Sequence, residues 1–248
     1  MSAPPHVSIV IPVYNEQAIL RDAVEELIAE LVAEGTAFEI VLSENGSTDD
    51  TVGLARALAQ ADARVRVLSS PEPNYGLALR SGIISARGDI VLCEEIDWCD
   101  AEFRRRAVAL IETGKADFVI GSKLLGESRD ERPWLRHVAS LCYTRLLHAL
   151  FDFQGTDTHG LKALRRSRLL EVVEACRVEK DVFASELVIR AARSGVRLCE
   201  IPVQVREKRP PSINLLKRVP NVLSNLGRLA WAIHVESRVA AADSRGVR

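Results

Sequence analysis

Long hydrophobic runs are missing from this sequence of 248 residues. No segment approaches the roughly 18 consecutive apolar residues that a membrane-spanning helix needs. Residues 1–6 also lack a basic segment followed by an apolar stretch, which is the pattern of a secretory signal. We therefore expect a cytoplasmic protein, either soluble or peripheral on the cytoplasmic face of a membrane.

An excess of either charge is missing as well. The chain has 33 basic and 34 acidic side chains, a formal net charge of −1. Nucleic-acid-binding domains usually have a strongly basic balance, so we expect no nucleic acid partner. The five cysteines are odd in number and have no paired metal spacing, which favours buried hydrophobes in a reducing compartment and argues against a zinc site.

Short apolar runs alternate with segments of helical period in the first half of the chain. The expected strands are Val7–Val13, Phe38–Leu42, Val65–Leu68, Ile90–Cys93 and Phe118–Gly121. The expected helices are Glu16–Ala33, a helix from Asp49–Asp50 to Ala61 capped by Ser47 or Thr48, Tyr75–Ser85, and Asp100–Thr113. This alternation predicts an α/β fold with a mostly parallel, Rossmann-like sheet and helices on both faces. No Gly-x-Gly-x-x-Gly follows the first strand, which argues against a dinucleotide-dependent dehydrogenase.

The second half of the chain is less regular. It contains a polar loop, Gly126–Pro133, and a turn at Gln154–Gly160. The remaining expected elements are helices at Trp134–Leu150, Ser167–Cys176 and Phe183–Ser194 and a strand at Arg197–Val203. Because neither a repeat nor a low-complexity linker interrupts the chain, we predict one domain over residues 1–205 and a C-terminal extension over residues 206–248.

Acidic side chains follow the strand Ile90–Cys93 directly. They are Glu94, Glu95, Asp97 and Asp100. Open α/β sheets bind ligands at the carboxyl ends of their strands, and carboxylate oxygens suit Mg²⁺ or Mn²⁺, which in turn suit phosphates. We predict that Glu95 and Asp97 bind a metal and a diphosphate, whereas Asp100 stabilises the start of the next helix. A purely helix-stabilising role for Glu95 and Asp97 is the alternative.

Three further polar motifs lie where predicted strands end or helices begin. They are Pro12–Glu16, Glu44–Thr51 and Asn74–Gly82. Side-chain oxygens of Glu44 and Asn45 are acceptors for nucleotide base or ribose groups, and a glycine such as Gly76 permits close approach of the backbone to a ligand. The structural alternatives are an ordinary turn after the second strand and a glycine that packs a helix.

In their order and placement, these motifs resemble family 2 glycosyltransferases with a GT-A fold, most closely the polyprenyl (dolichyl) phosphate mannosyl- and glucosyltransferases. The resemblance covers Val7 to Val205. Besides the motifs above, it rests on Gly121–Lys123, Arg136 with Ser140, Asp157–Lys162, Glu186–Leu187 and Glu200–Val203. It implies transfer of a hexose, with inversion, from GDP-mannose or UDP-glucose to a polyprenyl phosphate, with Mg²⁺ or Mn²⁺ as cofactor.

The resemblance also implies roles for individual residues. Catalytic and metal roles fall to Glu95 and Asp97, with Arg136 as a further catalytic residue. The donor-binding set is Pro12, Tyr14, Glu16, Glu44, Asn45, Asn74, Gly76, Glu95, Ile96, Asp97 and Lys123. The acceptor phosphate is expected at Arg136, Ser140 and Lys162.

Five positions depart from the pattern of the family. Glu44–Asn45 replaces an Asp-Asp pair, Glu95 begins a triplet that is usually Asp-x-Asp, Lys123 replaces an arginine, and Leu161 replaces an aromatic residue. Two other functions therefore remain open. One is a transferase with a soluble saccharide or natural-product acceptor, which would need a base such as Asp157 or His159. The other is a non-catalytic protein that binds nucleotide sugars.

The start of the C-terminal extension is basic and has apolar residues at helical spacing. The apolar residues are Leu215, Leu216, Val219, Val222, Leu223, Leu226, Leu229 and Ile233. Such a helix can lie on an anionic membrane surface, where the lipid tail of the acceptor would be embedded. Covering the core of the domain, or forming a dimer interface, are equally weighted alternatives.

Overall fold

The computed structural model describes residues 4–126, 129–130, 134–179, 182–205 and 224–234. Its centre is a seven-stranded sheet in the order β3-β2-β1-β4-β7-β5-β8. The strands are β1 Val7–Val13, β2 Phe38–Asn45, β3 Val65–Ser70, β4 Ile90–Cys93, β5 Phe118–Ser122, β7 Lys162–Arg165 and β8 Leu198–Pro202. β7 is antiparallel to both of its neighbours, and the other pairings in this sheet are parallel.

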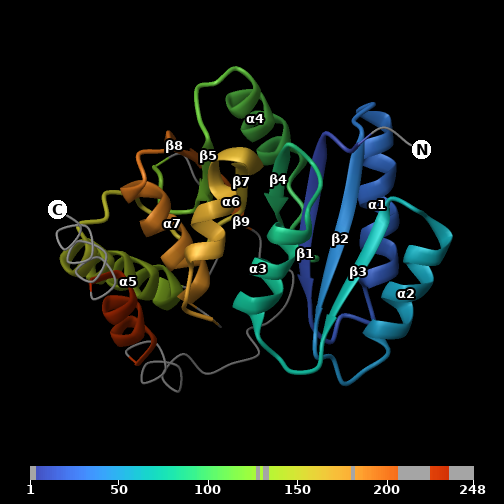
Figure 1. The fold of residues 1–248 in the computed structure, drawn as a ribbon, viewed down its shortest axis with the longest axis horizontal. Coiled ribbons are helices and arrows are strands. Elements are labelled where there is room, and N and C mark those ends of the chain that lie inside the picture. Colours follow the sequence, from blue (N-terminus) through green and yellow to red (C-terminus); the bar gives the residue numbers. More distant parts are fainter. Residues whose placement is uncertain (1–3, 127–128, 131–133, 180–181, 206–223, 235–248) are drawn as a thin grey trace, which may run out of the picture.

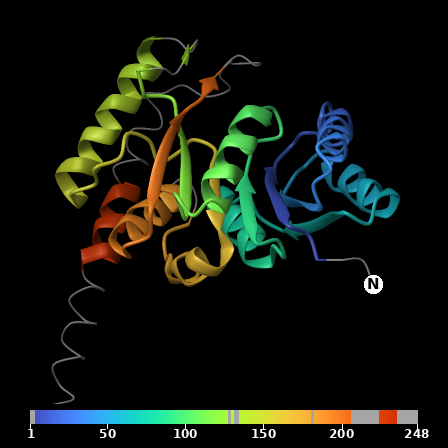
Figure 2. The same cartoon turned by 90° about the horizontal axis from the view of Figure 1, so that it is seen from above.

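Helices cover both faces of the sheet (Figures 1 and 2). They are α1 Leu20–Ala33, α2 Thr51–Ala61, α3 Tyr75–Ser85, α4 Ala101–Glu112, α5 Trp134–Phe151, α6 Arg166–Ala175 and α7 Phe183–Arg193. Successive strand residues point to opposite faces. In β1, Val10 joins the core under α3, α6 and α7, whereas Ile9 and Ile11 join the core under α1, α2 and α4. Burial on both faces explains why β1 is continuously apolar.

The predicted elements of the first half are all present, but several bounds differ: α1 begins at Leu20 instead of Glu16, β2 continues to Asn45 and β3 continues to Ser70. β1, α3 and β4 begin and end where the sequence predicts. The N-cap of α2 is Asp50, and the prediction of Ser47 or Thr48 is wrong. These two residues instead bond to Asn15 in the loop after β1: Ser47 Oγ accepts from Asn15 N at 3.0 Å, and Thr48 N donates to Asn15 Oδ1 at 2.8 Å.

Three strands were missed in the second half of the chain. β7 lies inside the large sheet, between β4 and β5, and β6 Arg129–Asp130 pairs with β9 Gln204–Val205 in a separate two-stranded sheet. β7 begins at Lys162 and ends at Arg165, with only two apolar residues between them. Four residues with charged ends do not give the apolar run that identifies a buried strand.

Residues 224–234 form a helix that packs on the domain. Leu226, Leu229 and Ile233 are buried in the same core cluster as α7. Leu226, Leu229 and Ile233 therefore cover the core of the domain, which is one of the alternatives predicted for the extension. Leu215, Leu216, Val219, Val222 and Leu223 lie outside the described residues, and the domain boundary at residue 205 stays a prediction. None of the helices described is long and apolar enough to span a membrane.

Candidate active site

The first two carboxylates after β4 have different environments. Glu94 is buried, and Arg104 of α4 donates from Nη1 to its two oxygens at 2.9 and 3.2 Å. Arg104 Nη2 also reaches Glu30 of α1 at 2.5 Å. Glu94 therefore joins two helices to the sheet inside the fold. Asp100 accepts a hydrogen bond from Phe103 N at 2.9 Å, which confirms its predicted role at the start of a helix.

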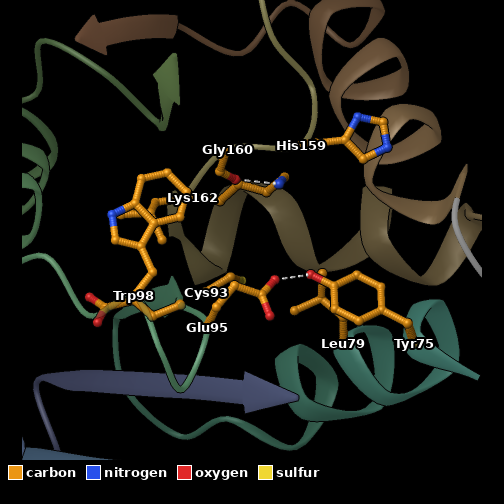
Figure 3. A pocket seen from close by; sticks show the side chains of 10 residues that line it. Tyr75, Leu79, Cys93, Glu95, Trp98, His159, Gly160 and Lys162 are labelled. Carbon is orange, nitrogen blue, oxygen red and sulfur yellow. Dashed lines mark hydrogen bonds between the residues drawn. The ribbon is translucent and has the colours of Figure 1, made fainter. Parts of the chain in front are cut away.

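A tight turn directs Glu95 toward the carboxyl edge of the sheet. Trp98 N donates to Glu95 O at 2.9 Å, and Ile96 is buried as the anchor of the turn. Ile96 therefore lies in the core, and its predicted donor contact stays a prediction. Tyr75, at the start of α3, donates from its hydroxyl to Glu95 Oε1 at 2.5 Å, and the two side chains point toward one another (Figure 3).

Glu95 is strongly perturbed electrostatically. Burial raises the pKa of its carboxyl to about 7, and the negative charges of Asp97 and Glu16 act in the same direction. The Tyr75 hydroxyl and the ammonium of Lys162 oppose this rise in the pKa. Repulsion among three acidic groups at one edge would be relieved by a bound cation.

The residues at this edge fit a divalent metal that is shared with a ligand. Glu95 and Asp97 supply hard oxygen atoms, and Glu95 Oε2 accepts no hydrogen bond from another described residue. Within the described residues, no group of three His, Cys, Asp or Glu side chains could hold a metal ion. Oxygens of a phosphate ligand would therefore have to complete the coordination shell, as is usual for Mg²⁺.

Lys162 lies across the pocket from Glu95 (Figure 3). It is the first residue of β7 and pairs with Cys93 of β4 and Ile120 of β5. Its Nζ donates to Gly160 O at 2.7 Å, and burial lowers the pKa of its ammonium. The pocket is lined by Tyr75, Leu79, Cys93, Glu94, Glu95, Trp98, His159, Gly160, Leu161 and Lys162.

The turn before β7 fixes a second lysine. Lys123 Nζ lies 3.3 Å from Asp157 Oδ2, and Asp157 Oδ1 accepts from His159 N at 2.8 Å. Burial would raise the pKa of Asp157, but Lys123, the hydrogen bond from His159 N and nearby charges together hold it below its usual value. Glu200 of β8 accepts from Thr156 N at 2.7 Å and stabilises the same turn.

The loops after β1 and β2 are joined by side-chain hydrogen bonds. Asn15 has a left-handed backbone, with φ of 54°. Asp50 N donates to Gln17 Oε1 at 3.0 Å, and Glu16 N donates to Thr51 Oγ1 at 2.8 Å. Tyr14 is exposed beside this junction, while Pro12 is buried within β1. The two loops therefore form one wall at the carboxyl edge, although Asn15 and Gln17 were not assigned from the sequence.

Glu44 and Asn45 bond within the fold at the end of β2. Glu44 accepts from Ser47 N at 2.5 Å and from Ser69 Oγ at 2.6 Å, and Asn45 Oδ1 accepts from Asn74 N. Both side chains are buried. Asn74 is the N-cap of α3, accepting from Leu77 N at 3.0 Å. These contacts favour a structural role for Glu44, Asn45 and Asn74. The predicted contacts of these three residues with the donor stay predictions.

The structure thus brings some predicted site residues together and leaves others apart. Glu95 and Lys162 line one pocket, with Asp97 and Glu16 close enough to shift the pKa of Glu95. Gly76 is buried at the start of α3, and Ser140 is half-buried on α5. The side chain of Arg136 lies outside the described residues, so its predicted role is unchanged. Tyr75 and Trp98 were missed as site residues, although Tyr75 lies within the Asn74–Gly82 motif and Trp98 directly follows Asp97.

The family model of glycosyl transferase family 2 matches residues 8–173. The chain belongs to glycosyl transferase family 2. The match includes β1 to β7 and so both sides of the pocket. The strand order and the solved structures below confirm the predicted GT-A fold.

Several glycosyltransferases are similar in sequence to this family 2 member. Glycosyltransferase AglD of Haloferax volcanii is 28% identical over 242 residues, covering 94% of this chain and 38% of that protein. An undecaprenyl-phosphate 4-deoxy-4-formamido-L-arabinose transferase of Pseudomonas aeruginosa is 32% identical over 206 residues, covering 82% and 58%. A dolichyl-phosphate beta-glucosyltransferase, ALG5D, of Trichomonas vaginalis is 27% identical over 222 residues, covering 82% and 66%. The chain therefore spans between about two fifths and two thirds of these relatives.

Among solved structures, glucosyl-3-phosphoglycerate synthase of Mycobacterium tuberculosis, in complex with Mn²⁺, UDP and glucosyl-3-phosphoglycerate, has a TM-score of 0.67. It is 23% identical, and the match covers 91% of this chain and 80% of the synthase. At this identity the likeness shows the fold. It does not assign a substrate to the family 2 member.

Proposed function

We propose that this family 2 member is an inverting glycosyltransferase that moves a hexose from a nucleotide sugar to a polyprenyl phosphate at a membrane surface. Mannose from GDP-mannose is the first assignment and glucose from UDP-glucose the second. The observation that carries the proposal is the pocket in which Glu95 faces the buried Lys162 at the carboxyl edge of β4. This position is the switch point of the sheet, between β1 and β4, where open α/β folds bind ligands.

The charges around the pocket suit two phosphate-bearing substrates. Glu95 and Asp97 would hold Mg²⁺ or Mn²⁺, which would neutralise charge on the diphosphate of the donor as it leaves. Lys162 presents a cation that is already desolvated, so its attraction to a phosphate is stronger than that of a solvated lysine. Lys123, held by Asp157 of the turn before β7, adds a second cation.

Among the described residues, the two candidate bases, Asp157 and His159, have partners of their own, which agrees with a phosphate acceptor. A phosphate monoester is already anionic at neutral pH and can attack without losing a proton to the protein. Both oxygens of Asp157 are engaged, with Lys123 and with the backbone of His159. His159 lies at the rim, where its Nδ1 pairs with the Thr158 hydroxyl at 3.1 Å.

The relatives support a lipid acceptor. Two of them are named for undecaprenyl phosphate and dolichyl phosphate. Peripheral attachment to the cytoplasmic face of a membrane would give this protein access to such a substrate. The donor-binding roles of Pro12, Tyr14 and Glu16, and the acceptor-phosphate roles of Arg136 and Ser140, belong to the same proposal.

The direct test is transfer by the purified chain from GDP-mannose or UDP-glucose to a short-chain polyprenyl phosphate, with Mg²⁺ or Mn²⁺, followed by mass spectrometry. We expect a glycosyl phospholipid product. Glu95→Gln and Asp97→Asn should lower kcat by on the order of 100-fold or more, because each removes charge from the metal site. Glu102→Gln, an exposed acid in the first turn of α4, is the matched control and should be neutral.

Other results would select the alternatives. Transfer to a free saccharide hydroxyl, without transfer to the lipid phosphate, would indicate the soluble acceptor. Nucleotide binding without turnover of any common donor would indicate a non-catalytic binding protein.

A further inference from the structure

The outer face of α5 is apolar where a surface helix is normally polar. Val138, Leu141, Leu146 and Leu150 are 41%, 36%, 40% and 44% exposed. At about 100° per residue, these four side chains fall within one half of the helix circumference, the half opposite the buried Leu147 and Phe151. Only Leu147 and Phe151 of α5 are buried among the side chains that the structure describes. The helix therefore presents most of its described leucines to solvent.

The helix of residues 224–234 extends this surface. His234 Nε2 lies 3.0 Å from Leu150 O, and its ring stacks on Phe151 with centroids 5.7 Å apart. Trp231 on the same helix is 63% exposed, the largest exposed fraction among the exposed large hydrophobic residues of the described chain. Both helices lie at the end of the molecule away from β3 (Figures 1 and 2). We call Val138, Leu141, Leu146, Leu150 and Trp231 the outer apolar face.

The charge around this face selects one kind of partner. Neither α5 nor residues 224–234 contain an aspartate or glutamate. The exposed charged side chains described on these two helices are Arg145 and Arg228. Apolar residues flanked by arginines complement a surface with an anionic layer above an apolar interior, as in a bilayer with acidic lipids. Two copies of the face would instead bring like charges together.

The inner side of α5 reaches the rim of the pocket. The Tyr143 ring contacts the His159 ring edge-on, with centroids 5.2 Å apart, and Thr144 Oγ1 donates to Thr156 O at 3.1 Å. The outer apolar face and the pocket rim are thus separated by one helix, roughly 10 Å across. A phosphate at the headgroup level of a bilayer would then lie near the rim when the face is in contact with lipid.

We infer that the outer apolar face of α5 and residues 224–234 docks on the surface of an anionic bilayer and so presents the pocket rim to a lipid-borne phosphate. The docking surface rests on the described side chains alone, and its link to turnover rests on the proposed function. This assigns lipid contact to α5, a helix for which the sequence predicted only residues that bind phosphate.

The test is co-sedimentation of the full chain with vesicles of phosphatidylcholine, with and without phosphatidylglycerol. The chain should bind the mixed vesicles more tightly than the neutral ones. Leu146→Asp with Leu150→Asp should weaken binding by roughly tenfold or more, because each carboxylate leaves the apolar layer and is repelled by the lipid headgroups. Arg145→Glu is a second variant that tests the charge without changing the leucines.

The matched control is Val32→Asp on α1, since Val32 is 53% exposed on a helix at the other end of the molecule. It should bind vesicles as the unchanged chain does. All variants should keep the same thermal unfolding midpoint, because the substituted side chains are exposed. With a water-soluble short-chain acceptor, the double leucine variant should keep its turnover; with a long-chain acceptor in vesicles, its turnover should fall with its binding.

Two results would overturn the inference. One is vesicle binding that the leucine substitutions leave unchanged, or no binding to anionic vesicles at all. The other is a dimer in light scattering that the same substitutions dissociate without any effect on lipid binding, which would assign the face to a second copy. Vesicle binding that responds to the substitutions as expected, without glycosyl transfer to any acceptor, would support the docking surface and contradict the proposed function.

Discussion

Glu94 and Glu95 are neighbours in sequence, but they have opposite roles because side chains alternate along an extended chain. Glu94 points into the protein and pairs with Arg104, whereas Glu95 points into the pocket and bonds to Tyr75. A buried acid with a basic partner stabilises the fold only as a pair. A buried acid beside other acids is available for a cation, and this difference separates the structural residue from the candidate ligand.

Tyr75 is the residue that positions Glu95, and Tyr75→Phe tests this. The substitution keeps the ring and removes the hydroxyl that donates to Glu95 Oε1. We expect Mn²⁺ affinity, measured by electron paramagnetic resonance in the presence of GDP or UDP, to fall about tenfold, as is typical when a partner of a metal ligand is lost. Tyr143→Phe, which removes a hydroxyl bonded to Ser185, is the matched control and should bind Mn²⁺ normally. Unchanged Mn²⁺ binding by Tyr75→Phe would contradict the positioning role.

His159→Gln distinguishes a phosphate acceptor from a hydroxyl acceptor. A general base usually contributes 10²- to 10⁴-fold to a rate. Because a phosphate acceptor needs no base, we expect kcat to fall by less than about tenfold and the pH profile to keep its shape. Steady-state kinetics between about pH 6 and pH 9 give both kcat and the shape of the pH profile. A loss of about 1,000-fold, with disappearance of one limb of the profile, would assign His159 as the base.

At the scale of elements, β7 places the lysine that the pocket needs. Its antiparallel insertion between β4 and β5 brings Lys162 next to Cys93, two residues before Glu95. The close packing of the preceding turn depends on Gly160. A Cβ on Gly160 would lie 1.6 Å from the carbonyl oxygen of Gly121.

Gly160→Ala should therefore destabilise the sheet at this crossing. Because the obstacle is backbone, β5 or β7 has to move, and we expect a loss of about 3 kcal/mol in the free energy of unfolding. Gly126→Ala is the control, since a Cβ there meets no atom within 4 Å. Urea unfolding followed by circular dichroism measures both variants. Equal stability of the two would show that the approach of the two backbones relaxes without strain.

Asp117 joins β5 to β8 at the opposite edge of the sheet. Its hydrogen bonds with Arg197, at 2.8 and 2.9 Å, lower the pKa of its carboxyl to about 2 from the ordinary value of 3.8. A lowered pKa stabilises the folded state above the unfolded pKa, and this contribution is lost as the pH falls from 3.8 toward 2.

Asp117→Asn should thus cost about 1 kcal/mol at neutral pH, a modest value because Arg197 is largely exposed to screening. The stability difference between the two proteins should shrink as the pH falls through this window. Urea unfolding at neutral and at acidic pH gives both differences. A difference that is independent of pH would mean that the charge of Asp117 does not contribute.

The same elements explain how far the sequence could be interpreted. β1, β2 and β4 are buried on both faces, so each is an apolar run with a clear end, and the acids after β4 are visible at once. The sequence therefore identified the edge of the sheet and its chemistry. It did not assign a structural role to Glu94, because that role depends on the position of Arg104 on α4. Nor could it place Lys162 opposite Glu95, because β7 has no apolar run of its own.

At the scale of the whole molecule, the pocket is lined by residues from both halves of the chain. Tyr75 and Glu95 come from the regular first half, and His159 and Lys162 come from the turn and strand that close the sheet. A ligand that contacts both halves would stabilise the folded chain, because it binds the folded state and not the unfolded one. The metal and the nucleotide should act together, since the carboxylates alone do not complete a coordination shell.

We therefore expect thermal unfolding to shift upward with nucleotide and Mn²⁺ together, and to shift much less with either one. At a ligand concentration of about 100 times Kd, the added stability is about 2.7 kcal/mol. Differential scanning fluorimetry with GDP and UDP, each with and without Mn²⁺, measures the effect and ranks the nucleotides. The joint effect should disappear in Glu95→Gln combined with Asp97→Asn and persist in Glu102→Gln. Equal shifts with and without metal in the unchanged chain would remove the metal from the donor site, while leaving the lipid-docking face untouched.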